Sequence, residues 1–498
     1  MDSPQTRWKR FFAAGLFVFA VVVLVNRQLL VFSYQTNLGG VEEIFAYYAQ
    51  RFSAGLPLYI KPNTPPYFIN QYGPLNPIIL GTLIKLFGGN SNPHLIFVLG
   101  RVLSLCYNLA TSVIIYKLLK TGFKQEKNLS AVAALLTFLV FYPHNYALRP
   151  DSLKTLLVIA SFYTIVLIGS GRTKNAVVAA LLLALAIFTK QDSLVFLPLF
   201  GLYLFIVNRA STWRFTLLTL ALVLFGALAF HFVYGAVFTE NIIRGLSQGV
   251  NFYYFEKLLS FTWQYILILA LSASTLFALR QDLSHERKPL FALGLLASAS
   301  LVFGFFSCLK WGSAPVYFCD ALILNAIFIT NAYTHLSTLK SRVTGTAFAV
   351  LLIGLLLLEY TSPLNKLWYK PAVEEKAKAS YAELKSLAGD HSLSNASIIC
   401  MAKEAEPFFM NRNLFPTYEA EFAEYYWCQG PLLKDRDLYY PHLLYKYPPL
   451  QQLPAPLYIL RHAECNPNGF LNLSDNDWTA TKRFGVYELD SICMQIPR

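Results

Sequence analysis

Long apolar runs separated by short polar segments dominate the first three quarters of the chain. Runs near 11–32, 93–118, 129–147, 151–169, 175–189, 191–207, 214–238, 260–279, 289–308, 314–335 and 343–361 are each candidate membrane spans. The run at 175–189 is short, so the total of about 11 could change by one or two. We therefore expect an all-α polytopic membrane domain.

Two segments between the first and second spans carry a different pattern. "EEIFAYYAQRF", after Gly39-Gly40-Val41, is aromatic and amphipathic, and "NPIILGTLIKLFG" is apolar but too short to span a bilayer. Between them, "KPNTPPYFINQYGPLNP" holds five Pro in seventeen residues. The region 33–92 therefore reads as a long loop in which two interfacial helices flank an ordered, non-helical segment.

The pattern changes near Lys370-Pro371. Residues 371–498 lack long apolar runs and hold 12 Lys or Arg against 16 Asp or Glu, whereas the whole chain has a net charge of +13. "VEEKAKASYAELKSLAG" has helical periodicity, and "ASIICMA", "PLYILRH" and "FGVYELD" read as short strands. We expect residues 1–370 to form the membrane domain and 371–498 a small α/β or α+β domain.

Basic residues predict the orientation. The N-terminal segment and every second connecting segment each carry at least two Lys or Arg, which puts the N-terminus in the cytoplasm and, with an odd number of spans, residues 371–498 outside. The positive charge therefore indicates membrane topology, and we expect no nucleic-acid partner.

Cys400, Cys428, Cys465 and Cys493 would lie in the exported domain. They are either free thiols or two disulfides of unknown pairing.

Charged residues cluster at the predicted outer ends of the spans. Glu42 and Glu43 follow the first span, and "LRPDS", "TKQDS" and "LKWGSAPVYFCD" each combine a cation with an acid. Charges at membrane borders are costly unless they are paired or functional. Each pair alone fits an interfacial ion pair or a helix cap, but the set on one face favours an active site. A carboxylate could take a proton from an acceptor hydroxyl, and cations could hold a departing phosphate.

The order of these parts resembles the GT-C membrane glycosyltransferases, in particular the branch of protein O-mannosyltransferases and aminoarabinose transferases. The matching pieces are Glu42-Glu43, "AGLPLY", "YGPLNP", Gly100-Arg101, "RPD", "TKQ" and a late Lys, Gly and Tyr stretch. That family's acidic pair usually begins with Asp, and this chain has Glu42-Glu43 instead.

The resemblance implies an inverting glycosyltransferase of a bacterial inner, or plasma, membrane. Its donor would be a polyprenyl-phosphate sugar, and its acceptor a glycan, a lipid or a protein. By order, Glu42 matches the family's catalytic position, with Glu43 as the alternative base. Arg149, Lys190 and Lys310 would bind the donor phosphate, and the residues that orient them or the acceptor would be Asp151, Asp192, Gln191, Tyr72, Tyr317 and Asp320.

Other functions stay open at this point. A flippase or transporter of lipid-linked glycans would place its charges near the middle of the membrane, and a polysaccharide polymerase or ligase would share most of the chemistry. The first predicted outer loop has no Asp-x-Asp triplet, so no tightly bound metal is implied, although a divalent cation stays open. The sequence names neither the sugar nor the acceptor.

Overall fold

The computed structural model describes most of the membrane region and part of the C-terminal region. The ranges described are 4–36, 42–62, 64–89, 92–141, 147–169, 175–246, 262–280, 287–310, 315–335, 368–400, 403–414, 456–462, 478–484 and 487–492, with a few single residues besides. Every structural statement below refers to these residues.

Helices make up nearly all of the membrane region. The α-helices are α1 (Pro4–Val31), α2 (Glu42–Ser53), α3 (Leu75–Leu86), α4 (Pro93–Lys117), α5 (Lys127–Phe141), α6 (Pro150–Gly169), α7 (Asn175–Thr189), α8 (Phe196–Val207), α9 (Arg209–Tyr234), α10 (Ala236–Leu246), α12 (Gln264–Leu279), α13 (Lys288–Ser307), α14 (Cys319–His335) and α16 (Pro371–Ala388). Short helical turns are η2 (Leu118–Gly122), η4 (Gln191–Val195), η5 (Pro315–Phe318), η6 (His391–Leu393) and η7 (Lys403–Phe408).

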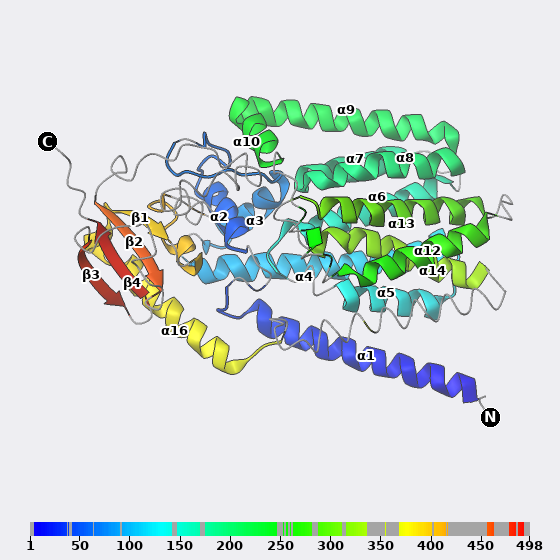
Figure 1. Ribbon diagram of the computed structural model, residues 1–498, viewed down its shortest axis with the longest axis horizontal. Coiled ribbons are helices and arrows are strands. Elements are labelled where there is room, and N and C mark those ends of the chain that lie inside the picture. The colour runs from blue at the N-terminus through cyan, green and yellow to red at the C-terminus, as the bar shows by residue number, and fades with distance from the viewer. Residues whose placement is uncertain are drawn as a thin grey trace.

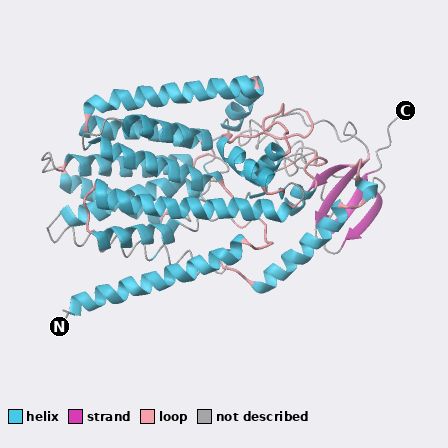
Figure 2. Cartoon of the chain, turned by 180° about the vertical axis from the view of Figure 1, so that it is seen from behind, coloured by secondary structure: helices cyan, strands magenta, loops and turns pink. Residues whose placement is uncertain are grey.

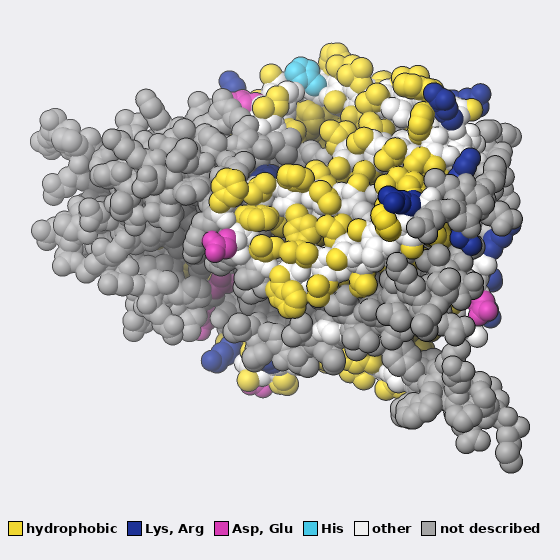
Figure 3. All heavy atoms as spheres, turned by 45° about the vertical axis from the view of Figure 1, so that its right-hand side comes forward, with side chains coloured by type: hydrophobic (Ala, Val, Ile, Leu, Met, Phe, Trp, Pro, Cys, Tyr) yellow, Lys and Arg dark blue, Asp and Glu magenta, His cyan; other side chains and the backbone are white. Residues whose placement is uncertain are grey.

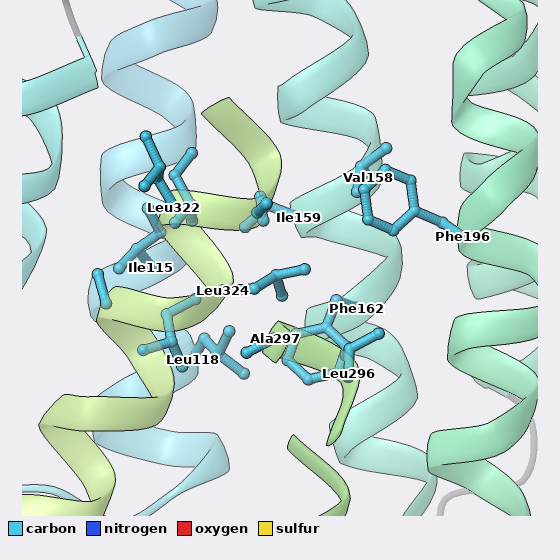
Figure 4. Close-up of a cluster of buried hydrophobic side chains, with 14 of the residues drawn as sticks. Ile115, Leu118, Val158, Ile159, Phe162, Phe196, Leu296, Ala297, Leu322 and Leu324 are labelled. Carbon is cyan, nitrogen blue, oxygen red and sulfur yellow. The ribbon is translucent and has the colours of Figure 1, made fainter. Parts of the chain in front are cut away.

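The long helices run roughly side by side and form one bundle (Figure 1). Close neighbours are α6 and α7, α13 and α14, α7 and α9, and α8 and α13. Their facing sides form a continuous apolar core, in which Phe162 of α6, Leu296 of α13 and Leu324 of α14 are almost completely buried (Figure 4). Burial of such side chains stabilises the contacts between helices that lie far apart in the sequence.

The surface of the bundle is apolar where lipid would contact it. Leu224, Phe225 and Phe232 of α9 are more than half exposed, and Figure 3 shows a broad hydrophobic face over the helices. Within the described residues, six helices are long and apolar enough to cross a membrane, and five further apolar helices are shorter. Helices are observed over ten of the eleven predicted spans, and the run at 343–361 falls outside the described residues, so the exact number of spans is not settled.

Local sequence signals set the ends of several helices. Asn92 and Asn208 cap α4 and α9, and their side chains accept hydrogen bonds from the backbone N–H groups of Leu95 and Ser211, both at 3.3 Å. Gly235, with φ of 73°, ends α9. The predicted span 214–238 is therefore interrupted, and α10 begins at Ala236 as a separate helix.

One end of the bundle carries the loop helices and the β-sheet, and we call it the sheet end. In Figures 1 and 2, α2 and α3 lie between the bundle and the sheet. Helix α16 lies between the end of α1 and the sheet. Both predicted interfacial helices are present as α2 and α3, and they pack on each other. Gly81 of α3 permits this contact, because a Cβ there would lie 2.6 Å from the Ala49 carbonyl oxygen.

The C-terminal region forms a four-stranded mixed sheet in the order β1-β2-β4-β3. The strands are β1 (Ser397–Cys400), β2 (Leu457–His462), β3 (Trp478–Phe484) and β4 (Tyr487–Ile492), and only the pair β1–β2 is parallel. The strands expected from "ASIICMA" and "PLYILRH" are observed as β1 and β2. The stretch "FGVYELD" instead contains the last residue of β3 and the first four of β4, and most of β3 had no sequence prediction.

Cys400 is a buried free thiol in β1. Cys428, Cys465 and Cys493 fall outside the described residues, so the structure does not address a pairing among them.

Candidate active site

Glu42, the first residue of α2, forms a buried ion pair with Arg101 of α4. Arg101 Nε lies 3.0 Å from Glu42 Oε1, and Arg101 Nη2 lies 2.7 Å from Glu42 Oε2. Both side chains are inaccessible to solvent. The pairing of two N–H groups with two oxygens is the strongest geometry available to this type of contact.

The same two residues also form hydrogen bonds with the backbone of neighbouring segments. Glu42 accepts backbone hydrogen bonds from Leu38 and from Leu148, both at 2.8 Å. Arg101 donates to the carbonyl oxygens of Ser33 and Leu30 at the end of α1. The pair therefore joins the end of α1, the start of α2, the middle of α4 and the segment that leads into α6.

These contacts change the proton affinity of Glu42. Burial alone would raise the pKa of its carboxyl group, but the Arg101 charge and the hydrogen bonds from Arg101, Leu148 and Leu38 outweigh burial and lower it. Each carboxylate oxygen already accepts two hydrogen bonds. Glu42 is therefore an ionised and fully engaged carboxylate. Glu43, the next residue, is also buried.

The segment held by Glu42 leads directly to a second set of charges at the sheet end. Arg149 Nε lies 3.1 Å from Asp151 Oδ2, and Lys190 Nζ lies 2.7 Å from Asp151 Oδ1. Asp151 is in the first turn of α6, and Lys190 stands between α7 and η4. Two of the three predicted phosphate-binding cations thus share one carboxylate, although they are 41 positions apart in the sequence.

Lys154, one turn further along α6, extends this network. Its Nζ lies 2.7 Å from Asp320 Oδ2 and 3.4 Å from Asp192 Oδ2. The Thr155 hydroxyl donates to the other oxygen of Asp320 at 2.6 Å. Lys154 was not among the predicted site residues, yet it is buried and links α6 to η4 and α14. Its position three residues after Asp151, on the same helix face, was the available signal.

Lys310, Tyr317 and Tyr72 complete the surroundings of Lys190. Lys310 is close enough to Lys190 and Asp192 to interact with both charges. The Tyr317 ring centre lies 4.2 Å from Lys190 Nζ, which is a cation–π contact. Burial and the nearby Tyr317 raise the pKa of Tyr72 to about 12, against the opposing charges of Lys190 and Arg149. Tyr72 thus stays neutral and can donate a hydrogen bond.

The first loop reaches the same place through its backbone. Gln191 Nε2 donates to the Gln71 carbonyl oxygen at 2.8 Å. Gly73 permits the loop to pass close to α7, because a Cβ there would lie 1.9 Å from the Phe188 carbonyl oxygen. These contacts fix the loop beside the charged residues.

We call this network of seven charged side chains the ionic cluster. Its members are Arg149, Asp151, Lys154, Lys190, Asp192, Lys310 and Asp320. The four cations exceed the three carboxylates by one positive charge. A buried excess of positive charge favours a bound anion, and Arg and Lys are the usual ligands of phosphate.

The structure brings most of the predicted site residues together, in two adjoining groups. The larger group is the ionic cluster with Tyr72, Tyr317 and Gln191. The smaller is Glu42 with Arg101, connected to the cluster through the backbone from Leu148 to Asp151. Within the described residues, no group of three or more His, Cys, Asp or Glu could hold a metal ion.

Part of the sequence matches the model of a known protein family. Residues 71–234 match the dolichyl-phosphate-mannose-protein mannosyltransferase family. The match covers less than half of the chain, but it includes α3 to α9 and the segments that carry Arg149, Asp151, Lys190 and Asp192. A search of curated proteins found no matching sequence.

Solved structures with the same fold extend the similarity to nearly the whole chain. ArnT from Cupriavidus metallidurans, bound to undecaprenyl phosphate, has a TM-score of 0.59 and 15% identity, with 96% of this chain and 98% of that chain covered. The Archaeoglobus fulgidus oligosaccharyltransferase, in complex with Zn and sulfate, has a TM-score of 0.53 and 12% identity, covering 90% of this chain and 68% of that chain. The family match and the shared fold confirm the resemblance of this chain to the GT-C membrane glycosyltransferases.

Proposed function

We propose that the protein transfers a sugar from a polyprenyl-phosphate donor to an acceptor hydroxyl at the sheet end of the bundle. The acceptor oxygen attacks the anomeric carbon, the bond from that carbon to the phosphate oxygen breaks, and the configuration of the sugar inverts. A base takes the acceptor proton, and the lipid phosphate leaves with one additional negative charge.

The ionic cluster is the observation that carries this proposal. A lipid phosphate that gains charge in the transition state needs preorganised cations, and such groups act most strongly in a buried site. Arg149, Lys190 and Lys310 supply them beside the apolar helices that a polyprenyl chain would contact. Arg149 can offer two N–H groups to two phosphate oxygens, whereas each Lys acts as a point charge.

The base is best assigned to the acidic pair at the start of α2. Within this pair we propose Glu43 as the base and Glu42 as a structural residue, because Glu42 already pairs with Arg101 and accepts hydrogen bonds from two backbone N–H groups. A carboxylate with a lowered pKa and no open acceptor position is a weak proton acceptor. Glu42 would instead hold Leu148, and through it Arg149, in place.

The orientation follows from the distribution of positive charge. Lys and Arg side chains are frequent at the end of the bundle away from the sheet (Figure 3), for example Arg209 and Arg214 at the start of α9. By the positive-inside rule that end is cytoplasmic, and the sheet end with the ionic cluster faces outward. A bacterial inner membrane, with transfer on its periplasmic face, fits this orientation.

A transporter of lipid-linked glycans is the alternative class. It would need charged groups near the bilayer midplane, often at broken helices. The ionic cluster instead lies at the first turns of α6 and α14 and in the connections before η4 and η5. This placement favours catalysis at a membrane surface.

Transfer assays in membrane vesicles test the proposal. Arg149→Gln and Lys310→Gln should weaken use of a polyprenyl-phosphate sugar in protein that still folds. Arg149→Gln should also lower the unfolding midpoint, because it leaves the buried Asp151 with one cation fewer. Glu375→Gln is a matched control, because Glu375 is an exposed carboxylate on α16. If both cluster variants transfer as well as this control, the cluster does not bind the donor phosphate.

A further inference from the structure

One oxygen of the ionic cluster has no hydrogen-bond partner. Asp192 Oδ2 lies 3.4 Å from Lys154 Nζ and 3.6 Å from Lys190 Nζ. Asp192 Oδ1 is buried and accepts no hydrogen bond. The whole side chain is nevertheless 15% exposed, so it lies at the border of the cluster and not deep within the bundle.

An unsatisfied buried carboxylate oxygen requires an explanation. Leaving such an acceptor without a partner costs about 1–3 kcal/mol, and nearly all buried polar groups in folded proteins are paired. The other two carboxylates of the cluster use both oxygens, because Asp151 pairs with Arg149 and Lys190, and Asp320 with Lys154 and Thr155. Of the cluster's three carboxylates, in the part of the chain that the structure describes, Asp192 is the one that leaves an acceptor position open.

The surrounding charges favour an uncharged donor as the partner. Two ammonium groups already face Asp192 Oδ2, and Lys310 is near enough to interact with it. A donor phosphodiester carries one negative charge, which offsets the single excess positive charge of the cluster. An ammonium group on the same ligand would restore that excess among cations in a buried site, which is unfavourable.

We propose that Asp192 Oδ1 accepts a hydrogen bond from a hydroxyl group of the donor's sugar, and that the cluster thereby selects an uncharged sugar over an amino sugar. The inference rests on the proposed function, since it assumes that Lys190 and Lys310, which both lie close to Asp192, hold the phosphate. A sugar bonded directly to that phosphate lies within reach of a carboxylate that contacts the same Lys190 ammonium. Asp192 is then a specificity-determining residue.

Binding to the purified full-length protein tests this assignment without requiring the acceptor. The probes are undecaprenyl phosphate alone, undecaprenyl phosphate carrying mannose, glucose or galactose, and the corresponding 2-amino and 4-amino sugars. Affinity is measured for wild type, for Asp192→Asn and for the exposed control Glu375→Gln. In wild type at least one neutral sugar should bind at least about tenfold more tightly than bare undecaprenyl phosphate, as expected for a hydrogen bond to a charged group. Its amino counterparts should lack this gain.

Asp192→Asn should lose most of the gain from the neutral sugar while it keeps its affinity for bare undecaprenyl phosphate. A purely structural bridge between Lys154 and Lys190 would instead lower the affinity for every probe by the same factor, and that result would overturn the assignment. Equal affinity of wild type for neutral and amino sugars would also overturn it. If wild type fails to bind undecaprenyl phosphate at all, the proposed function itself fails, and this outcome is distinct from binding without sugar preference.

Discussion

Arg101 and Glu42 meet through two parallel hydrogen bonds, of 3.0 and 2.7 Å, in a site that solvent does not reach. The pair connects the end of α1 to α4 and also holds the backbone of Leu148. Leu148 directly precedes Arg149 of the ionic cluster. The position of Arg149 therefore depends on the Glu42 carboxylate, which has no free acceptor position.

Arg101→Met should destabilise the protein, because it leaves the Glu42 carboxylate buried without its partner. Removing one member of a buried ion pair typically costs about 3–5 kcal/mol. The measurement is the thermal unfolding midpoint in detergent, with Glu375→Gln as the exposed control. An unfolding midpoint equal to that of the control would show that the pair contributes nothing to stability.

Gly100→Ala should disturb the same region by a steric route. A Cβ on Gly100 would lie 2.1 Å from Leu148 Cδ1, and Leu148 is only 2% exposed, so it has little space to move away. Overpacking of this kind costs about 1–3 kcal/mol and would shift Leu148 and the adjoining Arg149. We expect lower transfer activity together with a lower unfolding midpoint. Gly15→Ala is the control, since a Cβ at Gly15 meets no atom within 4 Å; equal behaviour of both variants would contradict the prediction.

The helices and the two interfacial segments could be predicted because apolar runs and proline positions are local signals. The site could be predicted only in part. Asp151 and Lys190 were selected as separate charged residues, but their contact depends on how α6 packs against α7, which no local pattern shows. Likewise, no local pattern shows that the Glu42 carboxylate is paired, because its partner Arg101 is 59 residues away. The strand β3 was missed because Lys482 and Arg483 interrupt its apolar pattern, while its pairing with β4 determines its structure.

Donor binding should weaken as the pH rises through about 8. Burial and the neighbouring Lys190 lower the pKa of Lys310 to about 8, against the opposing charge of Asp192. Lys310 is therefore charged below this pH and neutral above it, so its attraction for a phosphate disappears above pH 8. The measurement is the affinity for undecaprenyl phosphate from pH 6.5 to 9.5, and we expect Lys310→Arg to flatten the profile, because Arg stays charged. An unchanged wild-type affinity across this range would exclude Lys310 from phosphate binding.

The same shift predicts a pH effect on stability. Because the pKa of Lys310 is lower in the folded than in the unfolded protein, the unfolded chain binds more protons between about pH 8 and 10.5. The contribution of Lys310 to the free energy of unfolding should therefore rise with pH in that window. Comparing wild type with Lys310→Gln isolates this contribution, and a difference that does not change with pH would contradict the shift.

The sheet end should face outward. A reporter enzyme that is active only outside the cytoplasm, fused after Arg498, should be active, because the basic segments lie toward the other end of the bundle. A second fusion after Arg209, at the start of α9, should be inactive. The reverse pattern would place the ionic cluster in the cytoplasm.

The proposed transfer requires a base in the acidic pair, which takes the acceptor proton while the sugar leaves its lipid-phosphate donor. Mass analysis of lipid carriers in cells that lack the protein, complemented with wild type, Glu43→Gln or Glu375→Gln, tests this directly. A positioned base contributes about 100- to 10,000-fold in rate, so Glu43→Gln cells should accumulate a lipid-linked monosaccharide as cells without the protein do. Wild type and Glu375→Gln should remove it. If no lipid-linked sugar accumulates without the protein, the protein does not use a lipid-phosphate donor; if Glu43→Gln restores the wild-type lipids, Glu43 is not the base.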